Sequence, residues 1–445
     1  MYHHEEKSDL NIAPTHPVNQ SGVYSRAWGR VKNAGHRAWP ASASARSVGG
    51  RSLAVLLLSL TGGIPPGCTS PAAPGRSGIY PIAIRYTVEP LRLSDAGGPA
   101  GAMDRDFPRI RELGFNAVFV SHVASEDRDT VLRAARSHNL GVILPHRPIL
   151  RYVCSGAGDE KSSSVSEWGP VGLSSSALEP PVVMLHLGRV GDAPAAARAA
   201  RVADALARSA PDLRVCATIA PGCARPGELG TAVIPIVTVP ASDHVSGCAS
   251  DPTDGARRPA GAPRPGIMMI PVTGLCDDVD ATVRHWLGMY HAGLCAGGTC
   301  GVVMDAYAEV PGRQQGLVDR RGRLTVERSA AIKRIVNRAQ HWGPLICGAV
   351  PEVLHGAECF DEDLRTVLLT RRRRRFILVA NTSVTRFVRT RVTLPEQIGR
   401  APAQRAVRVP GDPGVIGGSV APLRHGEIRL TVDLAPGDAN LYELF

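Results

Sequence analysis

The sequence predicts an α/β chain in which a (β/α)8 TIM barrel is followed by a small antiparallel β-sandwich domain. From Asp104 to Arg147 an amphipathic helix, a buried strand, a second helix and a second strand follow one another. The same order recurs until eight strands can be counted, which is the number that a β/α barrel requires. After Glu358 the pattern changes to alternating apolar and polar residues without helices, which indicates antiparallel strands.

The N-terminal residues precede any predicted fold. Residues 1–45 are polar and have no periodic apolar pattern, so we expect a disordered extension. No Met lies between Met1 and Met103. We therefore expect the start to be mis-assigned and the true start to be a non-Met codon, for example at Val48.

Residues 46–68 have the composition of an export signal. Two arginines precede the apolar run Leu53–Leu60, and small residues lead on to Cys68. The run is too short to span a bilayer as a helix, so it indicates a secretory signal peptide. The context of Cys68 is similar to a bacterial lipoprotein signal. This predicts lipidation of Cys68 and a periplasmic or cell-envelope lipoprotein tethered to the membrane, whereas a merely cleaved signal predicts a secreted chain.

The predicted barrel occupies residues 79–345. Residues 69–78 are rich in Pro, Gly and Ser and form a flexible linker before it. All eight predicted strands are short apolar runs, as expected for parallel strands that are covered on both faces. They are Pro81–Tyr86, Ala117–Ser121, Gly141–His146, Val182–Leu187, Arg214–Ile219, Val233–Val239, Ile267–Val272 and Gly301–Asp305.

Helical patterns lie between these strands. Each shows apolar residues at a spacing of three or four, which is typical of a helix with one buried face. The predicted buried stripes are Phe107, Ile110 and Leu113; Val131, Leu132 and Ala135; Trp286, Leu287, Tyr290 and Leu294; and Ile332, Ile335, Val336 and Ala339, with a further helix at Ala195–Ala207. Long loops at Ser155–Pro180 and Ala241–Pro265 interrupt the alternation, and such loops often build binding sites.

The predicted sandwich occupies residues 346–445. Its strands alternate and carry turn residues between them. They are Thr366–Thr370, Phe376–Ala380, Phe387–Leu394, Gln404–Val409, Ile428–Leu434 and Leu441–Phe445. The run Arg371–Arg375 falls between two of these strands, so we interpret it as a solvated hairpin tip rather than an anion site.

Composition argues against a nucleic-acid partner. The chain has 51 Lys and Arg against 40 Asp and Glu, but the excess is spread along the sequence. Among the 10 cysteines there is no CxxC pair, so the spacing indicates no zinc site. We expect Cys216, Cys295 and Cys300 to be buried as small apolar residues. Disulfide pairing remains open among cysteines in predicted loops, namely Cys154, Cys223, Cys248 and Cys276.

Several segments together resemble β-galactosidase-like TIM-barrel glycoside hydrolases. They are Phe107–Val123, the segment from Thr282 to Tyr307, the turn Asp319–Gly322 and the terminal all-β module. The resemblance spans about Tyr80 to Phe445. It implies an envelope or secreted protein that hydrolyses O-glycosyl bonds with two carboxylates, one protonating the leaving oxygen and the other attacking or activating water.

The two implied glutamates are not found. After the fourth strand, where the family has its acid, the chain has Asp192 beside an alanine. After the seventh strand, Thr273 stands at the place of the nucleophile. Candidate catalytic carboxylates are therefore relocated ones, namely Asp305, Asp192, Glu309 and Asp243.

Other polar side chains follow the predicted strands, where the mouth of a β/α barrel lies. Arg85 and Arg147 suit a carboxylate or sulfate, because guanidinium groups bind such anions in a forked geometry. Aromatic residues make up only 4% of the chain, and Trp168 is the best candidate for stacking on a sugar. The candidate substrate-binding residues are Arg85, Tyr86, His122, His146, Arg147, Trp168, His186, His244 and Tyr307.

Two functions remain in view. Because both implied acids are absent, we favour an exported barrel that binds carbohydrate or a polymeric glycan with impaired or absent hydrolysis, a possible pseudoenzyme. The alternative is an active glycosidase that pairs Asp192 or Asp305 with Asp243 or Glu309. No metal site and no cofactor are expected, since His146, His186, His244, Asp243 and Asp305 lack local ligand spacing.

Overall fold

All of the residues that the computed structural model describes belong to one compact unit, Thr69–Phe445. It describes residues 79–87, 98–122, 127–155, 180–220, 229–230, 232–239, 265–272, 279–309, 316–319, 322–354, 358–359, 361–395, 397–398, 401–411 and 419–445. The predicted extension, the signal segment with Cys68, and the linker lie outside these residues.

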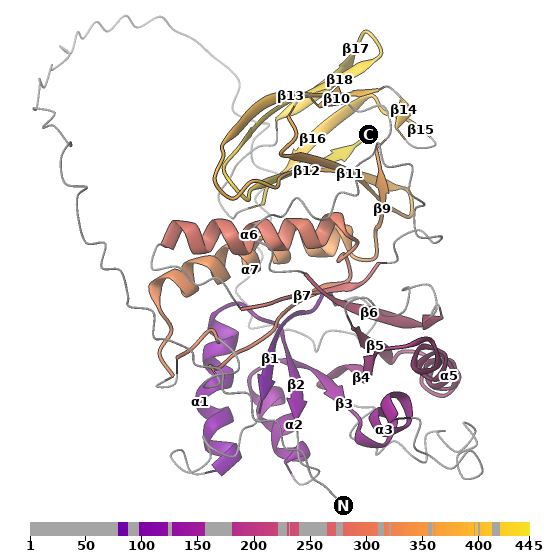
Figure 1. The fold of residues 1–445 in the computed structure, drawn as a ribbon, viewed down its shortest axis with the longest axis vertical. Coiled ribbons are helices and arrows are strands. Elements are labelled where there is room, and N and C mark those ends of the chain that lie inside the picture. The colour runs from indigo at the N-terminus through magenta and orange to yellow at the C-terminus, as the bar shows by residue number, and fades with distance from the viewer. Residues whose placement is uncertain are drawn as a thin grey trace, which may run out of the picture. The chain divides into compact units, whose positions relative to one another are not determined.

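The barrel is closed and all of its strands are parallel (Figure 1). Neighbours in sequence pair with one another, and the ring closes where Ile84 of the first strand lies opposite Met304 of the last. This confirms the predicted fold class. The strands are β1 (Ile82–Thr87), β2 (Ala117–His122), β3 (Gly141–Pro145), β4 (Val182–Val190), β5 (Arg214–Ile219), β6 (Val233–Thr238), β7 (Ile267–Ile270) and β8 (Gly301–Met304).

Alternation along each strand separates two cores. Residues such as Ala83, Phe119 and Val303 point inward and form the packed interior of the barrel. Their neighbours, such as Ile84 and Met304, point outward and pack against the helices. Because successive strand residues point to opposite faces, the position of a side chain on its strand decides whether it can reach the mouth of the barrel.

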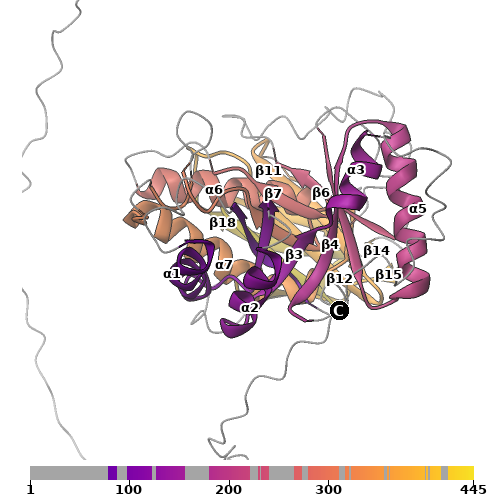
Figure 2. The ribbon, with the colours of Figure 1, turned by 90° about the horizontal axis from the view of Figure 1, so that it is seen from below.

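Helices cover the outside of the barrel. The predicted stripes are buried in them, from Phe107 in the first helix to Ala339 in the last. Figure 2 shows α1 beside α2, and α3 beside α5, in agreement with their contacts. The helices are α1 (Gly98–Glu112), α2 (Arg128–Ser137), α3 (Arg147–Ser155), α5 (Ala193–Ser209), α6 (Val279–Cys295) and α7 (Val326–Ile346). None of the helices that the structure describes is both long and apolar enough to cross a membrane.

Two elements of the barrel differ most from the sequence prediction. Strand β4 continues three residues beyond Leu187, to Val190, and pairs with β5 across an irregularity between His186 and Arg189. Helix α3 begins directly after β3, in a segment that the sequence does not predict to be helical. Pro148 lies in its first turn, a position where the missing backbone N–H costs nothing.

The C-terminal domain is an antiparallel sheet of nine described strands that curls around a single core. Alternate residues of β18, such as Ile428 and Leu430, face this core together with Ile377 of β12. The strand order in the sheet is β10 (Glu358–Cys359), β13 (Val388–Pro395), β18 (Glu427–Leu434), β17 (Val420–Arg424), β16 (Arg405–Val409), β19 (Ala439–Leu444), β12 (Arg374–Asn381), β11 (Leu364–Arg371) and β9 (Val350–Val353), with β14 (Gln397–Ile398) and β15 (Ala401–Pro402) as a separate pair. In this domain, β9, β10, β14, β15 and β17 are strands that the sequence does not predict.

The run of arginines turns between β11 and β12. Arg372 adopts a positive φ of 53° at the tip, and both Arg372 and Arg373 are exposed. The flanking arginines are engaged locally. Arg371 donates to the carbonyl oxygens of Pro344 and Leu345 at the end of α7, and Arg374 pairs with Glu443 at 2.7 Å. The run is therefore a hairpin tip, as predicted. Arg371 also ties the sheet to the end of α7, and Arg374 links β12 to β19 within the sheet.

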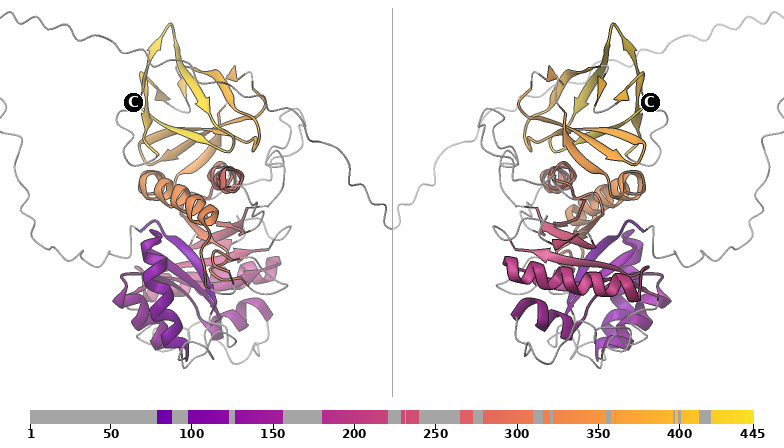
Figure 3. Two further views of the ribbon diagram at one scale, coloured as in Figure 1. Left: turned by 90° about the vertical axis from the view of Figure 1, so that its left-hand side faces the viewer. Right: turned by 90° about the vertical axis from the view of Figure 1, so that its right-hand side faces the viewer.

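Helices α6 and α7 lie between the barrel strands and the curled sheet (Figure 3). Trp342 of α7 is buried and donates its indole N–H to the carbonyl of Pro410 at 3.1 Å. His291 of α6 contacts the carbonyl of Gly437 at 2.8 Å. The two domains are thus joined by buried side chains of the last barrel helices.

Candidate functional site

A layer of polar side chains closes the interior of the barrel at the C-terminal ends of its strands. In six of the strands, or directly after them, a polar residue stands two positions beyond the last inward-facing apolar residue, and it therefore also faces inward. In β1, for example, Ala83 is followed two residues later by Arg85. We call this set the polar layer: Arg85, Ser121, His186, Thr218, Thr238 and Asp305. It occupies the end of the barrel where enzymes of this fold place their active sites.

An ion pair joins two members of the polar layer across the β1–β8 seam. Arg85 donates from Nη1 to Oδ1 of Asp305 at 2.8 Å. The side chains are 33% and 23% exposed, so the pair is partly open to solvent. The backbone N–H of Asp305 donates to the carbonyl of Ile270 at 2.9 Å, which fixes the residue against the end of β7. Asp305 thus lies in the polar layer, and its charge is balanced by Arg85.

His186 contributes a neutral imidazole to the polar layer. Its Nε2 lies 2.9 Å from the hydroxyl oxygen of Thr218, and its ring packs edge-on against Phe119 at 4.8 Å. Burial, reinforced by the positive charge of Arg85, lowers the pKa of His186 to about 3. At neutral pH the ring is therefore uncharged, and it offers a hydrogen bond rather than a proton to a ligand.

Hydroxyl groups complete the polar layer. Ser121 of β2 lies with its Oγ 2.8 Å from the Oγ1 of Thr87, the next inward residue of β1. Thr238 of β6 lies with its Oγ1 3.9 Å from the sulfur of Met269. The sequence prediction omits Ser121, Thr218 and Thr238, because hydroxyl residues inside a strand give no distinctive signal. Counting two residues beyond the last inward apolar position would identify all three.

Tyr86 and Tyr307 lie behind the barrel wall. Both are buried, and both donate their hydroxyl groups to Asp106 of α1, at 3.0 and 3.2 Å. Burial and the nearby carboxylate raise the pKa of each tyrosine, so both remain protonated donors. The predicted substrate-binding residues Tyr86 and Tyr307 are thus turned towards α1, and Asp106, which the prediction omits, holds them there.

The structure gives Asp192 a role in its own helix. Its Oδ1 accepts the backbone N–H of Ala195 at 2.7 Å, which caps the first turn of α5. Its side chain is exposed. Glu309 follows β8 and is partly buried, and its backbone N–H donates to the carbonyl of Val318 at 3.0 Å. Neither residue belongs to the polar layer around Asp305.

His146 lies just past the end of β3. It is 8% exposed, and its carbonyl accepts the N–H of Leu150 in α3. Burial and the nearby Arg128 lower its pKa to about 4. In the described part of the chain its Nδ1 is buried without a hydrogen-bond partner. By the alternation along β3, in which Ile143 points inward, His146 is on the side of the helices.

Trp168, Asp243 and His244 lie outside the described residues, as do the side chains of His122 and Arg147. Within the described ranges, no group of three or more His, Cys, Asp or Glu side chains is arranged to hold a metal ion.

The sequence matches no protein-family model. No curated protein is significantly similar to it. Among solved structures, an α-amylase from Anoxybacillus shares 12% identity with a TM-score of 0.45, covering 82% of this chain and 97% of that one. An α-amylase from Geobacillus thermoleovorans, solved with acarbose, shares 11% identity with a TM-score of 0.46 over 83% of this chain and 99% of that one.

A family 30 endoxylanase from Clostridium papyrosolvens shares 10% identity with a TM-score of 0.41, covering 82% of this chain and 96% of that one. These neighbours are glycoside hydrolases, whereas membership of the β-galactosidase-like superfamily is not confirmed.

Proposed function

We propose that this chain is an exported, glycoside-hydrolase-like barrel protein that binds carbohydrate at the cell envelope through the polar layer, with impaired or absent hydrolysis. The observation that carries the proposal is the composition of the polar layer. It combines a balanced ion pair, a neutral imidazole and three hydroxyl groups. The apolar run Leu53–Leu60 and the Cys68 context support export and tethering.

Such a layer suits a polyhydroxylated ligand. Sugar hydroxyls both donate and accept hydrogen bonds, and the Thr218 hydroxyl and the His186 ring can do the same. The charges of Arg85 and Asp305 offset each other, so the described part of the mouth has no strong preference for an anion or a cation. A neutral glycan therefore fits it better than a phosphate or a metal ion.

Hydrolysis requires more than the polar layer supplies. A glycosidase uses two carboxyl groups about 5 to 10 Å apart, one as acid and one as nucleophile or base. Among the described residues, Asp305 is the only carboxylate in the polar layer, and Arg85 holds it. Within the described residues, the polar layer therefore lacks the second carboxyl group that this mechanism needs.

The alternative function is an active glycosidase with relocated carboxylates. Asp305 would then act with Glu309 or Asp243, or Asp192 would supply one of the two groups. One observation favours this alternative: Asp305 directly follows β8, belongs to the polar layer and is partly exposed. Binding and activity measurements together separate the two functions.

We expect the purified chain to bind one or more neutral polysaccharides in affinity electrophoresis, without releasing reducing sugar. Thr218→Val removes a hydroxyl from the polar layer and should weaken binding about fivefold to tenfold. Thr390→Val on β13 makes the same change in the sandwich and should leave binding unchanged.

Hydrolysis of chromogenic glycosides provides the opposing test. Release of chromophore by the wild-type chain, abolished in Asp305→Asn, would establish the glycosidase and contradict impaired hydrolysis. Failure of the chain to bind any glycan of the panel would remove the carbohydrate-binding proposal altogether.

A further inference from the structure

Two cysteines lie together at the bottom of the barrel, opposite the polar layer. Cys300 directly precedes β8 and is buried, and Cys347 directly follows α7 and is partly exposed. Both are free thiols in the structure. The sequence prediction treats Cys300 as a small buried apolar residue and assigns no partner to it.

Backbone hydrogen bonds bring the two segments into register. The N–H of Gly348 donates to the carbonyl of Thr299 at 3.2 Å, and the hydroxyl of Thr299 donates to the carbonyl of Ala349 at 2.7 Å. Cys300 follows Thr299 and Cys347 precedes Gly348, so each cysteine adjoins this contact in sequence. The hydrogen bond holds the two backbones close together at this point, and a disulfide requires a Cα separation of about 4.4 to 6.8 Å.

Side-chain interactions agree with this placement. The backbone N–H of Gly348, the residue after Cys347, interacts with the sulfur of Cys300. Both thiols also act on Tyr80. Burial has the largest effect in raising the pKa of Tyr80, followed by Tyr290 and then by Cys347 and Cys300. The thiol of Cys347 also contributes to raising the pKa of Cys300, after the larger effect of burial, so the two thiols lie within electrostatic range of each other.

We propose that Cys300 and Cys347 form a disulfide that joins the start of the last barrel strand to the end of the last barrel helix. The bond closes a loop that contains all of α7, and it fixes the chain just before β9 enters the curled sheet. The barrel seam and the connection to the C-terminal domain are then secured by one covalent link.

The reaction is a thiol–disulfide exchange with a small disulfide such as oxidised glutathione. The thiolate of the more accessible Cys347 attacks one glutathione sulfur, forming a mixed disulfide and releasing one glutathione. The thiolate of Cys300 then attacks the Cys347 sulfur, which forms the protein disulfide and releases the second glutathione. Both protons go to the departing glutathione thiolates, and the two electrons reduce the oxidant.

Burial makes the second step slow, because it raises the pKa of Cys300 to about 11. Other described cysteines are less suited to the reaction. Cys216 donates to the carbonyl of Leu185 inside the barrel, and burial raises its pKa to about 12. Cys154 is exposed on α3, where its thiol donates to the carbonyl of Arg189.

The test oxidises the full native chain with glutathione disulfide, blocks the remaining thiols and maps peptides by mass spectrometry without reduction. We expect a linked peptide that contains Cys300 and Cys347 and is two hydrogens lighter than its separate parts. Reduction with dithiothreitol should lower the Tm by about 5 °C.

Cysteine variants identify the bond. Cys347→Ser should lose both the linked peptide and the redox-dependent change in Tm, whereas Cys154→Ser and Cys295→Ser should keep both. The proposal is overturned if native wild-type protein carries glutathione on Cys347 without linkage to Cys300, or if linkage forms only after unfolding in urea. The peptide map of the wild type decides this even if a variant fails to fold.

Discussion

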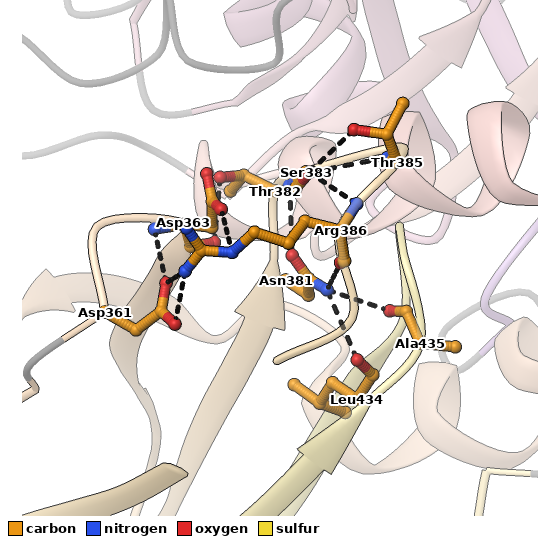
Figure 4. Close-up of polar contacts among 9 residues, drawn as sticks. All are labelled: Asp361, Asp363, Asn381, Thr382, Ser383, Thr385, Arg386, Leu434 and Ala435. Atoms are coloured by element: carbon orange, nitrogen blue, oxygen red, sulfur yellow. Dashed lines mark hydrogen bonds and ion pairs between the residues drawn. The ribbon is translucent and has the colours of Figure 1, made fainter. Parts of the chain in front are cut away.

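At the scale of single residues, the buried amide of Asn381 holds one end of the sandwich together (Figure 4). Its side chain is 1% exposed. The Nδ2 group lies 2.8, 3.3 and 3.1 Å from the carbonyl oxygens of Arg386, Leu434 and Ala435, and its Oδ1 accepts the N–H of Ser383 at 3.0 Å. One amide therefore satisfies backbone groups of the turn between β12 and β13 and of the end of β18.

We expect Asn381→Ala to lower the free energy of unfolding by about 2 to 3 kcal/mol, because it leaves buried carbonyl and N–H groups without partners. Urea denaturation monitored by circular dichroism measures the change. Thr385→Ala alters an exposed side chain of the same turn and should change stability by less than about 0.5 kcal/mol. Equal effects of the two substitutions would show that the buried amide is not the determinant.

The alternation of inward and outward residues along a strand also explains how far the candidate site could be predicted. Arg85, His186 and Asp305 lie at or near the ends of the predicted strands, and the sequence prediction includes them. Tyr86 is the last residue of the predicted first strand, but it is one residue out of phase with Arg85 and therefore faces α1. Strand ends can be identified from apolar runs, whereas the face that each residue occupies depends on the register between strands, which is set only when the barrel closes.

At the scale of elements, Asp192 decides where α5 begins. The chain leaves β4, and the Asp192 carboxylate caps the helix, with Pro194 in its first turn. A carboxylate at this position satisfies an N–H group and interacts favourably with the helix dipole. Asp192, which the sequence analysis names as a candidate catalytic acid, therefore stabilises the start of α5.

We expect Asp192→Ala to destabilise the chain by about 1 kcal/mol, and Asp192→Asn to have little effect because asparagine also caps helices. Thermal unfolding of both variants measures this difference. Carbohydrate binding should be unchanged in both. Loss of a glycosidase activity in Asp192→Asn, without loss of stability, would instead show that the carboxylate is a catalytic group.

Elements with strong local patterns could be predicted, and elements that depend on their neighbours could not. The helix predicted at Ala195–Ala207 is observed as α5, and the strand Arg214–Ile219 is observed with the predicted bounds, because composition and periodicity alone indicate both. The short helix α3 and strand β17 do not. Strand β17 contains a proline and alternates between exposed and partly buried residues, so it becomes a strand only because β16 and β18 pair with it.

At the scale of the whole molecule, a buried polar cluster joins the barrel to the curled sheet. His291 of α6 accepts at Nε2 from Arg338 of α7 at 3.1 Å, and Arg338 pairs with Asp438 at 2.6 Å. Because the carbonyl of Gly437 occupies the Nδ1 side of His291, that nitrogen carries the proton and the ring is neutral. Burial opposes ionisation of Asp438, yet Arg338 holds the pKa of that carboxyl below its usual value.

Acid should therefore loosen the connection between the domains. Burial, followed by the charge of Arg338, lowers the pKa of His291 to about 3. The unfolded chain binds a proton at His291 below a pH of about 6.5, whereas the folded chain does not. The contribution of neutral His291 to stability is complete above that pH and is lost as the pH falls towards 3.

We expect the free energy of unfolding to decrease as the pH is lowered from about 6.5 to 4.5. In His291→Asn this pH dependence should be shallower by about 1.4 kcal/mol per pH unit, the value for one proton. Urea denaturation at a series of pH values measures the slope. His341→Asn removes an exposed histidine of α7 and should leave it close to that of the wild type. An unchanged slope in His291→Asn would mean that this histidine takes up its proton in the folded state, and that the junction between the barrel and the sheet tolerates a second positive charge beside Arg338.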